Sequence, residues 1–160
     1  MDYNKMFKLI VAIVACEITG AIGSIFTIPN IPTWYANLAK PFFSPPNWVF
    51  GPVWTLLFLL MGVAFYIIWE NKDKKLLKKR NFAINWFGIQ FAFNILWSYL
   101  FFGLRNPFLG FVGIIFLWLS IVATIIYFYK IDKKAAYLLV PYLLWVSFAS
   151  LLNYFVMILN

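Results

Sequence analysis

Hydrophobic residues along this chain fall into five long runs that are separated by more polar connections. Each run is close to the length of about 20 residues that one α-helix needs to cross a bilayer. The runs cover residues 7–27, 47–69, 81–103, 108–129 and 135–158. This pattern predicts an all-α, polytopic membrane protein in which five transmembrane helices form a single bundle. The longest connection, residues 28–46, contains several prolines and is expected to be an ordered loop.

The charge pattern agrees with five crossings. An odd number of spans places the N-terminus and the second and fourth connections on one side of the membrane. Eleven of the 13 basic residues fall there: Lys5, Lys8, Lys72, Lys74, Lys75, Lys78, Lys79, Arg80, Lys130, Lys133 and Lys134. Lys40 and Arg105 fall on the other side. The positive-inside rule therefore predicts an inside N-terminus and an outward-facing first loop. The basic residues then serve topology and anionic membrane lipid, and we expect no nucleic-acid partner.

Composition excludes several classes of protein. The 160 residues are 64% hydrophobic and 11% charged, with a mean hydropathy of +0.86, whereas soluble domains carry about 25% charged residues. The chain has no His and one Cys. Zinc or copper sites built from His and Cys, internal disulfides, and Ser–His–Asp or Cys–His catalysis therefore lack their residues. We expect no metal ion and no resident cofactor.

The first run resembles a signal peptide, because Lys5 and Lys8 lie at the start of an apolar stretch. Glu17 interrupts the short apolar core, and the run then continues to Phe26. We therefore expect a retained first helix rather than a cleaved leader.

Small residues recur at every fourth position of the first run, at Ala12, Cys16, Gly20 and Ser24. Such a stripe lets another helix approach closely, either within the chain or in a dimer. Glu17 is the acidic residue that falls inside a hydrophobic run, and an ionisable group in hydrocarbon is costly enough to suggest a function. Protonation of Glu17 against a neighbouring helix is the other interpretation.

The first loop and the start of the next run are dense in aromatic residues and prolines. They read WYANLAKP from Trp34 to Pro41 and SPPNWVFGPVW from Ser44 to Trp54. Pro52 suits the first turn of the second helix, where a missing N–H is tolerated. Aromatic residues at this depth are typical of the belt at lipid headgroups. The alternative interpretation is that the first loop is a lid over a ligand site.

Two later runs each place polar and aromatic residues on one helical face. In the third run these residues are Gln90, Asn94, Trp97 and Phe101; in the fifth they are Tyr142, Trp145, Ala149 and Asn153. Helix packing explains either face alone. Two such faces beneath a Trp-rich loop favour an apolar ligand cavity with a few polar groups.

These residues resemble a known family. The run W-Y-x-x-L-x-K-P…P-P-x-W-x-x-G-P-V-W, from Trp34 to Trp54, is similar to the signature of the TspO/translocator protein family of tryptophan-rich sensory proteins and peripheral benzodiazepine receptors. Gly23-Ser24 and the segments 94–103 and 141–154 are also similar. The resemblance covers nearly the whole chain.

The resemblance implies a five-helix homodimer with a cavity under the first loop, in what we expect to be a bacterial cell membrane. Family members bind porphyrins such as protoporphyrin IX and benzodiazepine- or isoquinoline-type drugs. By motif position, the ligand-binding residues would be Ser24, Tyr35, Trp48, Trp54, Asn94, Trp97, Trp145 and Ala149. A metal-free porphyrin is the more natural guest, because the chain has no His to bind haem iron.

The chain departs from the family pattern in three places. Animal members end the fifth helix with a Leu/Val–Tyr–Lys/Arg cholesterol pattern, whereas Leu152 and Tyr154 are followed here by no basic residue. This absence argues against cholesterol as a partner. Ile25 replaces a basic residue that some members carry, and the Phe42-Phe43 pair replaces a Trp after Lys-Pro.

Three functions fit these features. A receptor or sensor needs only the cavity. A light- and oxygen-dependent porphyrin-degrading enzyme needs an oxidisable ring beside its substrate, for which Trp54 and Trp145 are the catalytic candidates. A tetrapyrrole transporter would move its substrate across the membrane, although the sequence shows no internal repeat of the kind common in transporters. Porphyrin binding is our first hypothesis.

Overall fold

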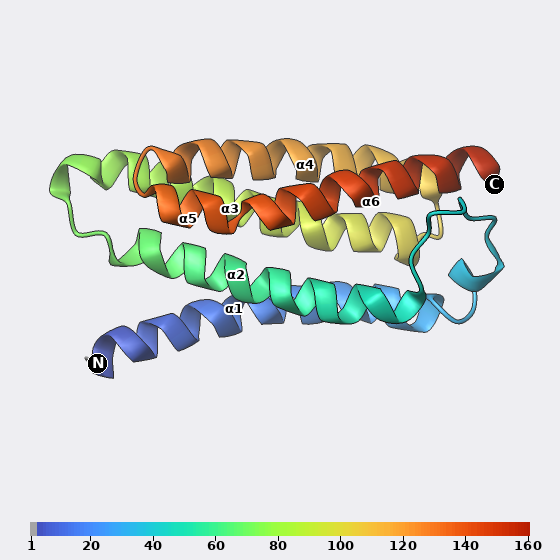
Figure 1. Ribbon diagram of the computed structural model, residues 1–160, viewed down its shortest axis with the longest axis horizontal. Helices are drawn as coiled ribbons and strands as arrows, with labels where there is room; N and C mark the ends of the chain where they lie inside the picture. Colours follow the sequence, from blue (N-terminus) through green and yellow to red (C-terminus); the bar gives the residue numbers. More distant parts are fainter. Residues whose placement is uncertain (1–2) are drawn as a thin grey trace.

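The computed structural model describes residues 3–160 as a bundle of antiparallel helices (Figure 1). The long helices are α1 (Tyr3–Thr27), α2 (Phe50–Glu70), α3 (Leu77–Ser98), α4 (Pro107–Tyr129) and α6 (Val140–Leu159), and a short helix, α5 (Lys133–Leu138), precedes α6. No β-strand occurs in residues 3–160. The polytopic, all-α membrane fold predicted from the hydrophobic runs is confirmed.

The last crossing consists of two helices rather than one. α5 and α6 are separated at Leu139. Pro141 falls in the first turn of α6, and because proline has no backbone N–H it cannot donate the bond that would continue α5. Together the two helices form one apolar segment, Lys133–Leu159, that is long enough to cross a bilayer.

The third crossing, α3, is the least apolar of the five. The other four are long and apolar enough to span a membrane by composition alone. α3 carries basic residues at 78–80 and buries the polar side chains of Gln90 and Asn94. It packs against α1 and α4 along the bundle. A π-helical turn, Tyr99–Gly103, extends it to the residue at which the sequence predicts its end.

α1 packs closely along α2, and glycines make this approach possible. A Cβ added to Gly62 of α2 would lie 2.6 Å from the Cα of Ile13. A Cβ added to Gly20 of α1 would lie 2.5 Å from the ring of Phe58. The earlier members of the small-residue stripe on α1 are buried. This part of the stripe, Ala12 and Cys16, therefore serves helix packing within the chain.

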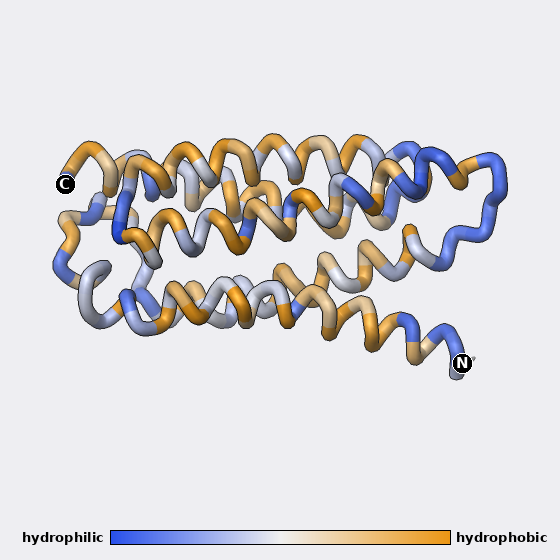
Figure 2. The backbone as a smooth tube through the Cα atoms, turned by 180° about the vertical axis from the view of Figure 1, so that it is seen from behind, coloured by the Kyte–Doolittle hydropathy of each residue, from blue (hydrophilic) through white to orange (hydrophobic). Residues whose placement is uncertain are grey.

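The polarity of the bundle suits a bilayer. Large apolar side chains such as Phe116 and Leu144 are exposed, whereas Gln90, Thr124 and Asn153 are buried. Hydrophilic segments gather at the two ends of the bundle (Figure 2). The start of α1, the α2–α3 connection and the α4–α5 turn share one end, so the eleven basic residues named above lie together. The first loop and the end of α6 share the other end.

Candidate ligand-binding site

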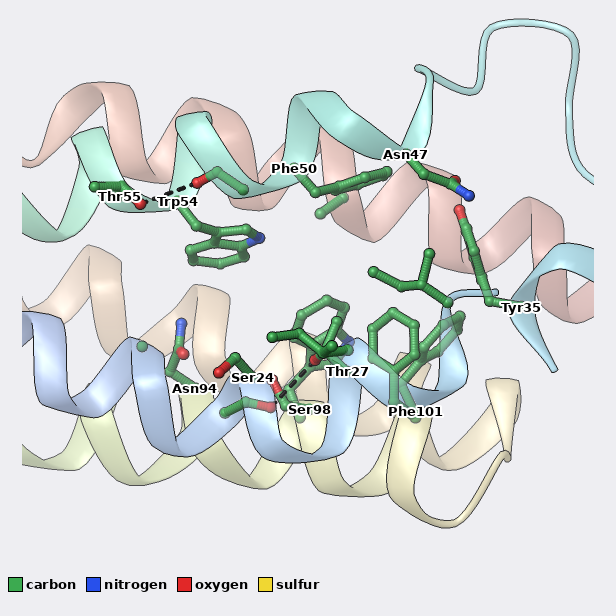
Figure 3. Close-up of a pocket in the computed structure, with 18 of the residues that line it drawn as sticks. Ser24, Thr27, Tyr35, Asn47, Phe50, Trp54, Thr55, Asn94, Ser98 and Phe101 are labelled. Carbon is green, nitrogen blue, oxygen red and sulfur yellow. Dashed lines mark hydrogen bonds between the residues drawn. The ribbon is translucent and has the colours of Figure 1, made fainter. Parts of the chain in front are cut away.

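A cavity of about 490 Å³ lies in the half of the bundle next to the first loop (Figure 3). Its walls come from α1, α2, α6 and the end of α3 with its π-helical turn. Ile31 and Tyr35 contribute from the first loop. Volumes of about 300–1,000 Å³ are typical of sites that enclose small molecules.

Aromatic rings form much of the cavity wall. Phe50, Trp54 and Phe58 recur every four residues on α2 and share one helical face. Trp54 stacks on Phe58 with ring centroids 5.7 Å apart. On α3, Trp97 stacks on Phe101 at 5.9 Å and lies 6.2 Å from Trp54. The cavity therefore offers two rows of flat apolar surface, which approach each other at the two indoles.

The two indoles use their N–H groups differently. The Trp97 N–H donates to Oδ1 of Asn153 at 3.2 Å, and Nδ2 of Asn153 donates to the carbonyl oxygen of Pro107 at 2.8 Å. These bonds fix Trp97 against α6 and the start of α4. The Trp54 N–H makes no hydrogen bond to any of residues 3–160. It is free to donate to a ligand.

A few other polar groups reach the cavity. The side-chain amide of Asn94 donates to the hydroxyl of Tyr142 at 3.0 Å. The hydroxyl of Ser24 donates to a carbonyl of its own helix at 2.7 Å. The hydroxyl of Thr55 does the same at 3.1 Å (Figure 3). Because each hydroxyl donates its hydrogen bond to a backbone carbonyl, its oxygen remains able to accept a hydrogen bond from a ligand.

Tyr35 holds the first loop against the cavity. Its side chain is buried, and its ring lies 6.2 Å from that of Phe101 and 5.7 Å from that of Phe102. The ammonium of Lys40 lies 4.6 Å from the centre of the Tyr35 ring, a cation–π contact. Burial raises the pKa of the Tyr35 hydroxyl, so the group stays protonated at physiological pH.

Two further contacts tie the first loop to the rest of the bundle. The Asn160 side chain accepts a hydrogen bond from the N–H of Ala39 and donates one to its carbonyl, each at 3.0 Å. Arg105 donates from Nε to Oδ1 of Asn30 at 3.0 Å. Arg105 has a φ of 52°, which few residues with a side chain adopt, in the turn before α4. The loop is thereby attached to α6 and to the α3–α4 turn.

Part of the cavity wall on α1 and α2 is exposed. Three of the residues that line it on these helices are exposed: Ala21, Gly51 and Thr55. Their side chains are small. Because the exposed sides of membrane-spanning helices face lipid, this part of the cavity wall borders the bilayer.

The structure brings together six of the eight ligand-binding residues expected from the sequence. They are Ser24, Tyr35, Trp54, Asn94, Trp97 and Ala149. Trp48 does not line the cavity; it lies in a one-turn 3₁₀ helix, Asn47–Val49, and is 74% exposed. Trp145 does not line the cavity either; its ring lies 6.0 Å from that of Phe50, which does. Of the two catalytic candidates, Trp54 therefore borders the cavity and Trp145 does not.

Several lining residues were missed by the sequence analysis. The spacing of four residues on either side of Trp54 is the signal that would have indicated Phe50 and Phe58. The sequence predicts that Asn153 shares a face with Tyr142, but nothing in it indicates that Asn153 accepts a hydrogen bond from Trp97. Glu17, for which the sequence indicated no partner, also lines the cavity. Within residues 3–160, no three His, Cys, Asp or Glu side chains gather as a metal ion would require.

The fold and the site define a polytopic helical membrane protein with a ligand-sized aromatic cavity beneath a tethered loop. A sequence model of the TspO/MBR family matches residues 12–159. The chain belongs to that family, and the resemblance found in its sequence is confirmed.

The relatives agree with this membership over almost the full length of the chain. It is 46% identical to the tryptophan-rich protein TspO of Archaeoglobus fulgidus, across 98% of this chain and 99% of the relative. It is 42% identical to the tryptophan-rich protein TspO of Chlorobaculum tepidum, across 98% of both chains. The human translocator protein is 36% identical, across 83% of this chain and 78% of the relative.

Proposed function

We propose that this protein is a membrane receptor or sensor that binds porphyrins, such as protoporphyrin IX, and benzodiazepine- or isoquinoline-type molecules in the cavity. The observation that carries the proposal is a space of about 490 Å³ between two rows of aromatic rings. Flat aromatic guests gain both buried area and favourable ring contacts on such walls. The name of a relative from Cereibacter sphaeroides, tryptophan-rich sensory protein, supports a sensory role.

The polar groups suggest how a guest is held. The free N–H of Trp54 donates to a ring nitrogen or carbonyl of the guest, and the hydroxyl of Ser24 accepts from an N–H. The carboxylates of a porphyrin lie toward the loop end, near Lys40, because Glu17 at the other end of the cavity would repel them. The apolar part of the macrocycle then lies between α2 and α3.

An equilibrium titration tests this proposal. Protoporphyrin IX is added to the purified protein in detergent, and its absorbance and the quenching of tryptophan fluorescence are followed together. We expect saturable binding of one porphyrin per chain, with an isoquinoline carboxamide displacing it. Linear, non-saturating uptake equal to that of empty detergent micelles would contradict the proposal.

Porphyrin degradation is a second candidate, and the position of Trp54 favours it. A porphyrin in the cavity would lie beside this indole, which light and oxygen can oxidise together with the macrocycle. If the protein directs this chemistry, illumination in air gives one defined product, whereas anaerobic or dark samples give none. A mixture identical to that formed in empty micelles would leave binding as the function.

We also propose that the N-terminus faces the inside of the cell. The clustering of basic residues at the end of the bundle that carries the start of α1 supports this orientation. The cavity and the first loop then face outward.

A further inference from the structure

Glu17 is an acidic side chain that the bundle leaves unpaired. It lies on α1, lines the cavity and is half-buried. Its carboxylate makes no hydrogen bond and no ion pair with any of residues 3–160. A carboxylate inside a membrane span is expensive and is expected to have a partner. An ionised Glu17 would therefore take its partner from outside residues 3–160.

Lys8 of α1 and Lys40 of the first loop are already engaged in contacts of their own. Lys8 lies nine residues earlier on α1, about 13 Å along the helix axis, and pairs with Glu70 at 3.3 Å. Lys40 lies over the ring of Tyr35 and donates to carbonyls of the first loop. Within residues 3–160, no Lys or Arg lines the cavity. The formal charge of the cavity wall is thus the single negative charge of Glu17.

The position of Glu17 makes the two ends of the cavity chemically different. Glu17, Ala21 and Ser24 follow one another at spacings of four and three, so they share the face of α1 that lines the cavity. α1 runs from Glu17 toward the first loop, so Glu17 lies at the end of the cavity away from Tyr35. A guest that fills the cavity has one end at the loop and the other end at the carboxylate.

We infer that Glu17 is the recognition site for a positively charged nitrogen, and that the cavity prefers flat aromatic ligands that carry a basic amine at one end. This inference rests on the proposed function and names the ligand class that the site selects. An ammonium group placed on Glu17 makes a charge-assisted hydrogen bond where the dielectric constant is low. A neutral guest leaves the carboxylate without a partner and forgoes this interaction.

A matched pair of probes tests the inference. One is an isoquinoline carboxamide that carries a dimethylamino group, and the other carries an isopropyl group of the same shape. Wild-type protein is expected to bind the amine at least about tenfold more tightly than the isopropyl compound. Glu17→Gln should remove this preference, because the neutral amide offers the ammonium group no opposite charge. The control variant Glu70→Gln removes a negative charge at the far end of the bundle and should keep the preference.

The outcomes separate this inference from the function on which it rests. Equal binding of the two probes to wild type overturns the role of Glu17 but leaves an aromatic ligand site in place. A preference for the amine that persists in Glu17→Gln also overturns it. Failure of wild type to bind either probe or protoporphyrin IX removes both proposals. If Glu17→Gln does not fold, Glu17→Asp retains the charge and should keep part of the preference, and its loss there counts against the inference.

Discussion

The indole N–H of Trp97 on α3 donates to the side-chain oxygen of Asn153 on α6 at 3.2 Å, across 56 positions of sequence. Asn153 donates in turn to the carbonyl of Pro107 at the start of α4. One amide therefore joins three helices and fixes the ring on which an aromatic guest would stack. Because Asn153 is buried, both of its bonds are shielded from competing solvent.

Replacing Asn153 with Ala should lower stability and loosen the cavity wall. It leaves the Trp97 N–H and the Pro107 carbonyl without partners. Hydrogen bonds between membrane helices contribute about 0.6 kcal/mol on average and up to about 1.7 kcal/mol. A double-mutant cycle with Trp97→Phe, measured by unfolding in detergent, should give a coupling energy in that range.

The matched control for this cycle is the hydrogen bond from Trp118 to Ser147, at 2.8 Å between α4 and α6. Neither residue lines the cavity. Trp118→Phe should therefore leave porphyrin affinity unchanged, whereas Asn153→Ala should reduce it. Additive energies in the Asn153 cycle, together with unchanged affinity in Asn153→Ala, would show that the bond does not hold the site.

Trp54 and Trp145 should respond differently to the same substitution. Trp54→Phe removes an N–H that faces the cavity, which should weaken porphyrin binding by about two- to tenfold if a neutral hydrogen bond is lost. Trp145→Phe removes a buried N–H that has no partner among residues 3–160. It should leave affinity unchanged and should not lower stability. The reverse order of effects in a fluorescence titration would place the ligand on the other side of Phe50.

Two glycines give a matched test of the α1–α2 contact. Gly62→Ala places a Cβ against the backbone of Ile13, and overpacking of this kind costs about 1–3 kcal/mol. A Cβ on Gly88 of α3 meets nothing within 4 Å. Gly88→Ala should therefore raise stability by up to about 1 kcal/mol through helix propensity. Thermal unfolding of both variants checks the contrast, and equal shifts would refute the close packing.

The proposed orientation is tested by labelling in intact cells. Ala36 is exposed in the first loop, and Lys74 is exposed in the α2–α3 connection. Each is replaced by Cys in a separate variant, Ala36→Cys and Lys74→Cys. An impermeant thiol reagent should label the first variant in whole cells and the second only after lysis. The native Cys16 is buried and provides little background. Labelling of Lys74→Cys, but not of Ala36→Cys, in whole cells would show the opposite orientation.

Much of the fold follows from local physics and could be predicted. Membrane spans require long apolar runs, so their number and approximate limits are visible in the sequence. The break at Leu139 was missed, although Pro141 is its cause and is visible in the sequence. The periodicity of α3 correctly assigned Asn94 and Trp97 to one face, because every helix has the same repeat.

The parts that were not predicted depend on how helices are set against each other. The sequence predicts inward faces for both Trp54 and Trp145, but Trp54 lines the cavity and Trp145 contacts Phe50 without lining it. The exposure of Trp48 depends on the path of the first loop, which no periodicity describes. The placement of Glu17 in the cavity wall depends on the rotation of α1 against α2. Residue spacing within one helix contains no information on that rotation.

The central claim is that guests occupy this cavity, and filling it tests the claim most directly. Ala149 lines the cavity from α6 and is 6% exposed, whereas Ala92 lies exposed on α3 outside the cavity. Protoporphyrin IX is titrated into wild type, Ala149→Phe and Ala92→Phe, with the unfolding temperature of each recorded. The account predicts at least about tenfold weaker binding in Ala149→Phe alone, since a phenyl ring would take up the space of the guest. Equal affinity in all three folded proteins would contradict it.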